Sequence, residues 1–131
     1  MLAHIPLMII PFIAYNAIAL TSASGNPWVG EVATFSLIST GVWIMTLGDV
    51  MLLVALFFLF VEIIKSTRTS NASVVDHLLS TLVFVAFLVE FLVVPAAATS
   101  VFFLMTVMAA VDLMAGFSVS IRSAGRDVSI G

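Results

Sequence analysis

Four polar residues lie near the middle of apolar stretches, where a lipid bilayer would surround them: Asn16, Asp49, Glu90 and Asp112. A charged side chain at the bilayer centre costs about 2.5–3.5 kcal/mol on insertion scales, so such residues normally face a bundle interior, a water-filled cavity or a partner. No Lys or Arg lies within these stretches. Because a buried carboxyl without a cation favours its neutral form, we expect Asp49, Glu90 and Asp112 to hold their protons more tightly than carboxyls in water.

Two functions suit such residues. In the first, the acids and the amide are inter-helix contacts that hydrogen-bond to neighbouring helices or to another subunit. In the second, Asp49, Glu90 and Asp112 take up and release a proton or cation near the membrane midplane, as in a channel or carrier. The sequence leaves both open, and we expect the first.

A second polar group flanks one loop: Glu62, Asp76 and His77. These residues could lie close together, but their spacing matches no specific metal motif. His4 and His77 could also be read as axial ligands of a haem. The simpler interpretation places His77 at the membrane interface beside Asp76 at a helix start, where an acid suits the helix dipole. We therefore expect no metal and no cofactor.

The chain as a whole has the composition of a membrane protein. Its 131 residues are 63% hydrophobic and 8% charged, and its mean hydropathy is +1.31. Soluble domains are about 45–50% apolar and about 25% charged. The sequence therefore predicts a single all-α membrane domain over 1–131, a four-helix bundle. The expected spans are 5–23, 33–64, 74–94 and 99–121.

The basic residues predict the orientation of these spans. Two lie between the second and third spans and two follow the fourth: Lys65, Arg68, Arg122 and Arg126. Since basic residues favour the cytoplasmic side, both termini should be cytoplasmic, in a bacterial inner membrane. The loop 24–31 is then external. We expect Trp28 in the interfacial aromatic belt and Trp43 deeper, as a packing residue.

Helical spacing predicts which faces pack. In the second span, small residues and one acid recur every seven positions, namely Gly41, Gly48, Ala55 and Glu62. In the fourth span the spacing is four, through Asp112, Gly116, Ser120 and Ala124. Small residues let helices approach closely. The third span should face inward through Asp76, Ser80, Val83, Phe87, Glu90 and Val94. Pro11 should kink the first helix and free the carbonyl of Leu7.

Several function classes are excluded or disfavoured by the sequence. The chain has no cysteine, so disulfides, thiolate metal sites and thiol redox chemistry are absent. Four basic residues are too few for a nucleic-acid surface. Without a nucleophile motif or a phosphate loop, we expect no enzyme. The expected partners are the lipid bilayer and copies of this chain or other membrane subunits.

A resemblance covers roughly residues 48–127. The segments that carry it are FVEIIKSTRTSN, VVDHLLSTLVFVAFLVEFL and ATSVFFLMTVMAAVDLMAGFSVSIRSAGRD. This part of the chain resembles a group of small uncharacterised four-helix inner-membrane proteins of proteobacteria. The resemblance implies a bacterial inner-membrane location and carries no assigned activity or site.

Overall fold

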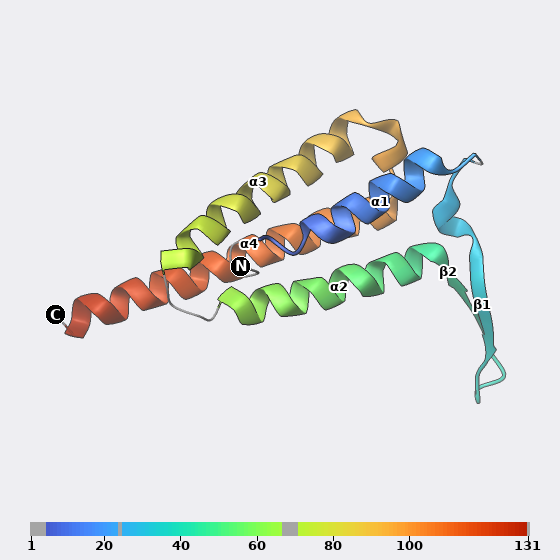
Figure 1. Cartoon of the computed structure of the whole chain (residues 1–131). Helices are drawn as coiled ribbons and strands as arrows, with labels where there is room; N and C mark the ends of the chain where they lie inside the picture. Colours follow the sequence, from blue (N-terminus) through green and yellow to red (C-terminus); the bar gives the residue numbers. More distant parts are fainter. Residues whose placement is uncertain (1–4, 24, 67–70, 131) are drawn as a thin grey trace.

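Figure 1 shows the computed structural model of the chain. It describes residues 5–23, 25–66 and 71–130, with the side chains of 71–74 and 119–130 left out. The elements, in chain order, are α1 (Ile9–Thr21), the 3-10 helix η2 (Pro27–Val29), β1 (Glu31–Ser36), β2 (Val42–Thr46), α2 (Leu47–Ser66), α3 (Asn71–Val93), the 3-10 helix η3 (Pro95–Ala97) and α4 (Ser100–Ile130).

Three of these helices are long and apolar enough to cross a membrane. The qualifying segments are Leu47–Ser66, Val75–Val93 and Ser100–Ser118, of 20, 19 and 19 residues. At about 1.5 Å per residue each reaches roughly 30 Å, the thickness of a bilayer core. The expected membrane class is therefore supported by three helices.

The first helix is shorter than the predicted span 5–23. Helix α1 has 13 residues and begins at Ile9. Pro11 therefore lies in the first helical turn, where no intrahelical N–H donor is needed, and it does not break the helix. The Leu7 carbonyl is not left free either, because it accepts a hydrogen bond from the Ile10 N–H at 3.1 Å. The predicted kink at Pro11 is wrong for this reason.

The predicted second span 33–64 was wrong over residues 33–46, nearly half of its length. Residues 31–46 form an antiparallel hairpin, with Phe35 paired to Trp43 and Ser36 to Val42. The helix starts only at Leu47. Val32, Ile44 and their aromatic neighbours favour extended backbone. The turn closes through Leu37 N–H donating to the Gly41 carbonyl at 2.8 Å. High hydropathy alone did not distinguish this hairpin from a continued helix.

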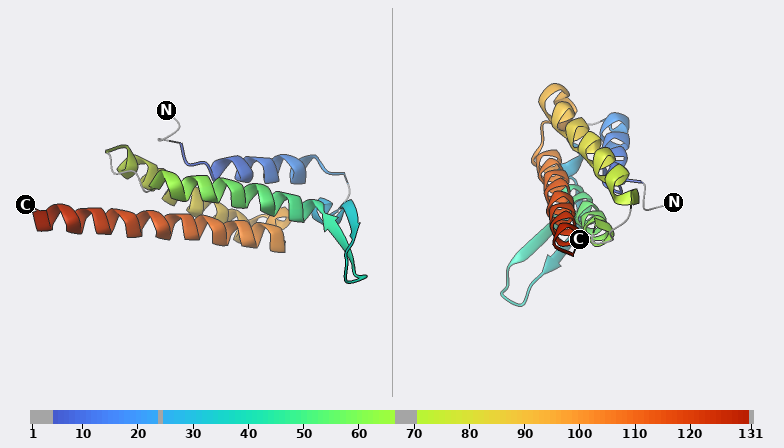
Figure 2. Two further views of the ribbon diagram at one scale, coloured as in Figure 1. Left: turned by 90° about the horizontal axis from the view of Figure 1, so that it is seen from below. Right: turned by 90° about the vertical axis from the view of Figure 1, so that its left-hand side faces the viewer.

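The four helices pack as a bundle around an aromatic core. Helix α4 packs against both α2 and α3, and α1 lies on the opposite side of the bundle from α4, beside α2 and α3 (Figure 2). The Phe12 ring of α1 meets Phe87 of α3 edge-on, with centroids 4.9 Å apart. The Tyr15 ring lies edge-on to Phe102 of α4 at 4.8 Å. The predicted inward face of α3 is confirmed, since its members Asp76, Ser80, Val83 and Phe87 are buried and Glu90 and Val94 are partly buried.

The two tryptophans exchange the roles expected for them. Trp28 is 3% exposed and stacks on Tyr15 with ring centroids 4.4 Å apart. Trp43 is 43% exposed, because it lies on the hairpin and not in a helix. Hence Trp28 is the packing residue and Trp43 the surface aromatic, the reverse of the sequence prediction.

The predicted small-residue seam of α2 is confirmed over three of its four members. Gly48, Ala55 and Glu62 are buried, whereas Gly41 lies in the exposed hairpin turn. A methyl group added at Gly48 would come 2.7 Å from Val101 Cγ2 and 3.0 Å from the Trp28 carbonyl oxygen. On α4, Asp112 and Gly116 of the second stripe are buried. The side chains of Ser120 and Ala124 lie outside the described ones.

The close approach at Gly48 predicts a destabilising substitution. We expect Gly48→Ala to lower the free energy of unfolding by about 1–3 kcal/mol, the usual cost of overpacking, because the new methyl would overlap Val101 Cγ2 and press on the Trp28 carbonyl. Equilibrium unfolding in detergent micelles measures this change. Gly41→Ala is the matched control, since its new methyl would meet only the exposed Ser39 hydroxyl at 3.3 Å. Equal stability of the two variants would contradict the prediction.

Candidate functional site

Buried polar side chains gather where the end of α2, the start of α3 and the middle of α4 meet the segment before α1. We call the following five residues the polar cluster: Glu62, Lys65, Asp76, Ser80 and Asp112. Its three acids and Ser80 are each 6% exposed or less. The cluster lies toward the end of the bundle where α1 starts, α2 ends and α3 starts (Figure 1).

Glu62 is the most deeply buried acid of the cluster. It is 1% exposed. Its Oε1 accepts a hydrogen bond from the Leu7 N–H at 2.6 Å and another from Lys65 Nζ at 2.9 Å. Leu7 lies ahead of α1, where its N–H has no helical partner, so the carboxylate caps the chain before this helix. Glu62 therefore ties the N-terminal segment to α2.

Lys65 joins three parts of the chain through one ammonium group. Its Nζ donates to the Ile5 carbonyl at 2.6 Å, besides its bond to Glu62, and lies 3.6 Å from Asp76 Oδ1 of α3. The side chain is 14% exposed. A buried cation requires such partners, since an unpaired charge in an apolar interior is strongly unfavourable.

Asp112 completes the cluster from α4. It interacts electrostatically with Glu62, Asp76 and Lys65, and it lies in hydrogen-bonding range of Ser80. Ser80 is on α3, one turn beyond Asp76. The favourable partners of the Asp112 carboxyl are therefore Ser80 of α3 and Lys65 of α2, whereas Glu62 and Asp76 carry like charge.

His77 lies beside the cluster, in close contact with α4. A methyl group built on Gly116 would overlap the imidazole ring at Cε1 and Nδ1, so the glycine makes room for the ring. The same ring stacks on Phe117 with centroids 6.2 Å apart. Its buried Nε2 has no hydrogen-bond partner among the described residues, and neither does Asp76 Oδ1.

The chemistry available to this cluster is that of proton and charge pairing. Three carboxyls surround one ammonium, so the site carries a surplus of acidic groups in a low-dielectric environment. In such an environment the acidic groups depend on the ammonium and on hydrogen bonds for compensation. Within the described residues, no group of three His, Cys, Asp or Glu side chains is arranged to hold a metal ion.

The structure separates the four predicted midplane residues into three places. Asp112 belongs to the polar cluster. Asn16 of α1 lies near the half-buried Glu90 of α3, and its Nδ2 donates to the Phe12 carbonyl at 2.9 Å. The four predicted residues therefore do not form one site at the membrane midplane.

Asp49 lies at the other end of the bundle, in the first turn of α2. Its Oδ2 accepts from the Thr46 N–H at 3.0 Å, and its own N–H donates to Thr46 Oγ1 at 3.2 Å. This reciprocal pair is a capping box at a helix start. The expected midplane position of Asp49 was wrong, because the hairpin takes the place of the first part of the predicted span.

The three residues assigned to the second polar group do come together. Glu62 and Asp76 are both within the cluster, and His77 adjoins it. Sequence reasoning missed Lys65, which it used only as an indicator of orientation. The signal was present in the Glu62–Lys65 spacing of three, which places both side chains on one helix face. His4 and Arg68 lie outside the described residues, as do the side chains of Arg122 and Arg126.

A small cavity lies at the opposite end of the bundle, near the hairpin. It has a volume of about 200 Å³ and is lined by residues of the α1–β1 connection and of η3, among them Asn26, Trp28, Pro95 and Thr99. The Tyr15 hydroxyl donates a hydrogen bond at 2.8 Å to the carbonyl of Ala96, a residue that lines this cavity. No carboxyl lines this cavity, so the predicted acids do not converge on it.

The pairing in the cluster predicts a strong coupling between Lys65 and Glu62. We expect Lys65→Met to lower the free energy of unfolding by about 3 kcal/mol, the lower end for a broken buried pair, because it leaves the carboxylates without their cation. In the double variant that combines Glu62→Gln with Lys65→Met, part of the lost free energy of unfolding should be recovered, since the buried charge of Glu62 is removed as well. Unfolding of both single variants and the double variant measures the coupling. Glu31→Gln, an exposed acid, is the control, and strict additivity would contradict the pairing.

Comparisons with known proteins identify no relative of this chain. No family model, no curated protein and no solved structure matches the chain. The resemblance to small inner-membrane proteins of proteobacteria therefore stays a prediction.

Proposed function

We propose that this chain is a non-enzymatic integral membrane protein that acts as a small oligomer or as an accessory subunit of a membrane complex. In this role its buried acids are inter-helix contacts. The observation that carries the proposal is the polar cluster. Glu62, Asp76 and Asp112 are used to join α2, α3, α4 and the N-terminal segment. Their positions suit a structural role, because each acid has partners within its own chain.

The outward surface of the bundle supports assembly with other helices. Within an 18-residue apolar stretch of each spanning segment, only 28%, 22% and 33% of the residues are buried within the chain. The remainder presents large apolar side chains, such as Phe57, Phe60 and Leu82. In a membrane such a surface contacts either lipid or further helices, and helix packing there depends on shape more than on hydrophobicity.

The proposal includes the orientation expected from the basic residues. Lys65 lies toward the end of the bundle where α1 begins and α4 ends (Figure 1). If basic residues mark the cytoplasmic side, this end faces the cytoplasm and the hairpin faces outward. The proposed location is a bacterial inner membrane.

The assembly is tested in extracts of native membranes. We expect the tagged chain, solubilised in mild detergent, to run in native mass analysis as a particle that contains more than one 14.0 kDa chain or other polypeptides. Asp112→Asn should leave the particle unchanged, because Asp112 is buried within its own chain. A monomer without other polypeptides would contradict the proposal. Loss of the particle in a folded Asp112→Asn protein would instead make this acid an inter-subunit contact.

A second candidate function, proton or cation movement, is favoured by one observation. Three acids share one cation, and Asp76 Oδ1 and His77 Nε2 are buried without hydrogen-bond partners among the described residues. Groups of this kind can exchange a proton. The relay would then use Asp76, His77 and Asp112, and not the separated Asp49 and Glu90.

Flux into proteoliposomes tests this second candidate. We expect a carrier to lose most of its proton or cation flux in Asp112→Asn and in Asp76→Asn, because an amide cannot exchange a proton at this site. Asp49→Asn is the matched control, since the amide oxygen of asparagine can still accept from the Thr46 N–H and Asp49 lies outside the cluster. Absence of flux in the wild-type protein, or equal flux in all variants, would reject the candidate.

A further inference from the structure

The hairpin β1–β2 is apolar and has few contacts with the bundle. Between Glu31 and Thr46 the only charged residue is Glu31 itself. The large apolar side chains of the hairpin are exposed: Phe35 and Trp43 each have an exposed fraction of 43%, and Ile38 is fully exposed. An isolated two-stranded ribbon is marginally stable in water, so a surface that covers it would stabilise it.

The two faces of the hairpin differ in chemistry. One face carries the cross-strand pairs Ala33–Met45 and Phe35–Trp43, and the Phe35 and Trp43 rings stack with centroids 5.4 Å apart. We call these four residues the aromatic face. The opposite face carries the pairs Thr34–Ile44 and Ser36–Val42 and so includes two hydroxyls. At its base the aromatic face is half-buried, at Ala33 and Met45.

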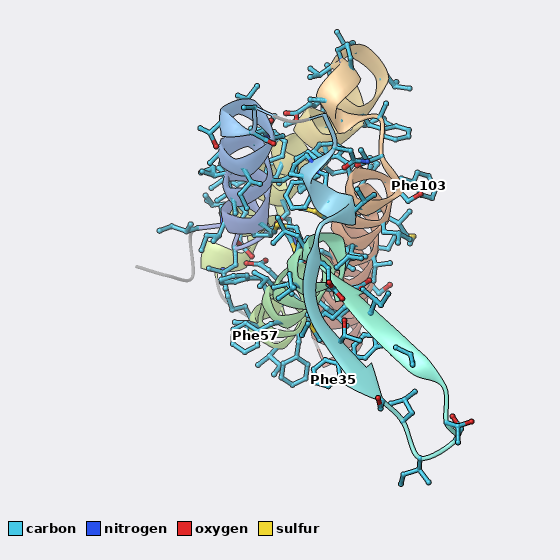
Figure 3. The ribbon with its side chains drawn as sticks, turned by 90° about the vertical axis from the view of Figure 1, so that its right-hand side faces the viewer. Phe35, Phe57 and Phe103 are labelled. Carbon is cyan, nitrogen blue, oxygen red and sulfur yellow. The ribbon has the colours of Figure 1, made fainter. Side chains whose placement is uncertain are left out.

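The hairpin runs across the bundle axis and extends beyond the helices. In both side views the strands run across the direction of α2 and α4, at the end where α2 begins (Figures 1 and 2). Seen along the bundle, Phe35 of the hairpin and the exposed Phe57 of α2 lie on the same side of the molecule (Figure 3). Because the spanning helices fix the membrane normal, the hairpin lies parallel to the membrane plane, over the lipid next to α2.

We propose that the aromatic face of the hairpin rests on the lipid interface beside α2. Tryptophan is enriched at this depth, where its ring can be apolar on one side and hydrated on the other. The hairpin is continuous with the spanning surface, since β2 leads into α2 without a break. The strand edges remain in hydrated headgroups, where their backbone groups find water. This inference rests on the proposed insertion of α2, α3 and α4 in a membrane.

Cysteine labelling tests the face that meets lipid. The chain has no cysteine of its own, so Phe35→Cys and Ser36→Cys give matched single sites on neighbouring residues of opposite faces. In phosphatidylcholine vesicles, a water-soluble maleimide should label Ser36→Cys several-fold faster than Phe35→Cys. In denaturing detergent the two rates should become equal. Equal rates in vesicles would overturn the inference.

Trp43 fluorescence gives an independent measurement that needs no change at Phe35. The signal of Trp43 is the difference between the wild-type protein and Trp43→Phe, which leaves the buried Trp28 in place. We expect Trp43 to be quenched by vesicles of brominated phosphatidylcholine more than by aqueous iodide. Stronger quenching by iodide would overturn the inference.

Two further outcomes distinguish a failure of the hairpin inference from a failure of the proposed membrane insertion. Protection of Phe35→Cys that increases with the protein-to-lipid ratio would mean that a second copy covers the hairpin, and the lipid assignment would fail. Extraction of the protein by alkaline carbonate would mean that the helices do not span the membrane, so that the proposed function itself would fail. Labelling that is equal on both faces of a carbonate-resistant protein would overturn the hairpin inference alone.

Discussion

The buried carboxyls of Glu62, Asp76 and Asp112 lie in an apolar bundle, and the Lys65 ammonium is the described cation that faces them. An unpaired charge in such an interior is strongly unfavourable, so the helices are stable in this arrangement only if the charged groups stay together. Lys65 reaches Asp76 only when α3 lies beside α2. The pairing therefore constrains helix order and helix register together.

The same constraint reaches the N-terminal segment. Lys65 and Glu62 bind the Ile5 carbonyl and the Leu7 N–H, which lie ahead of the first helix and have no helical partners there. The short helix α1 is consequently held at two places. At its start the polar cluster holds the backbone, and near its middle Tyr15 bonds to Thr99 and to the Ala96 carbonyl and stacks on Trp28.

The two ends of the bundle thus have different physical characters. One end concentrates titratable groups inside the protein, whereas the other presents an almost uncharged hairpin outside it. Close helix packing connects them, through Gly48 against Val101 near the hairpin and Gly116 against His77 near the cluster. This combination of a fixed interior and an apolar exterior suits the proposed role as a structural membrane subunit.

The sequence by itself indicated the membrane class and four spans, of which three correspond to helices long enough to cross a bilayer, as well as the inward face of α3 and most of the seam of α2. These features could be predicted because hydropathy and helical spacing are local properties. It also indicated that Glu62, Asp76 and His77 could meet, since they flank one short loop. It did not determine the hairpin, because an apolar run of β-branched and aromatic residues suits a strand as well as a helix. Only the tertiary structure decided which acids share a site, which tryptophan is buried and what Lys65 does. These depend on where each helix begins and on which helices are neighbours, and both are settled by contacts between residues far apart in the chain.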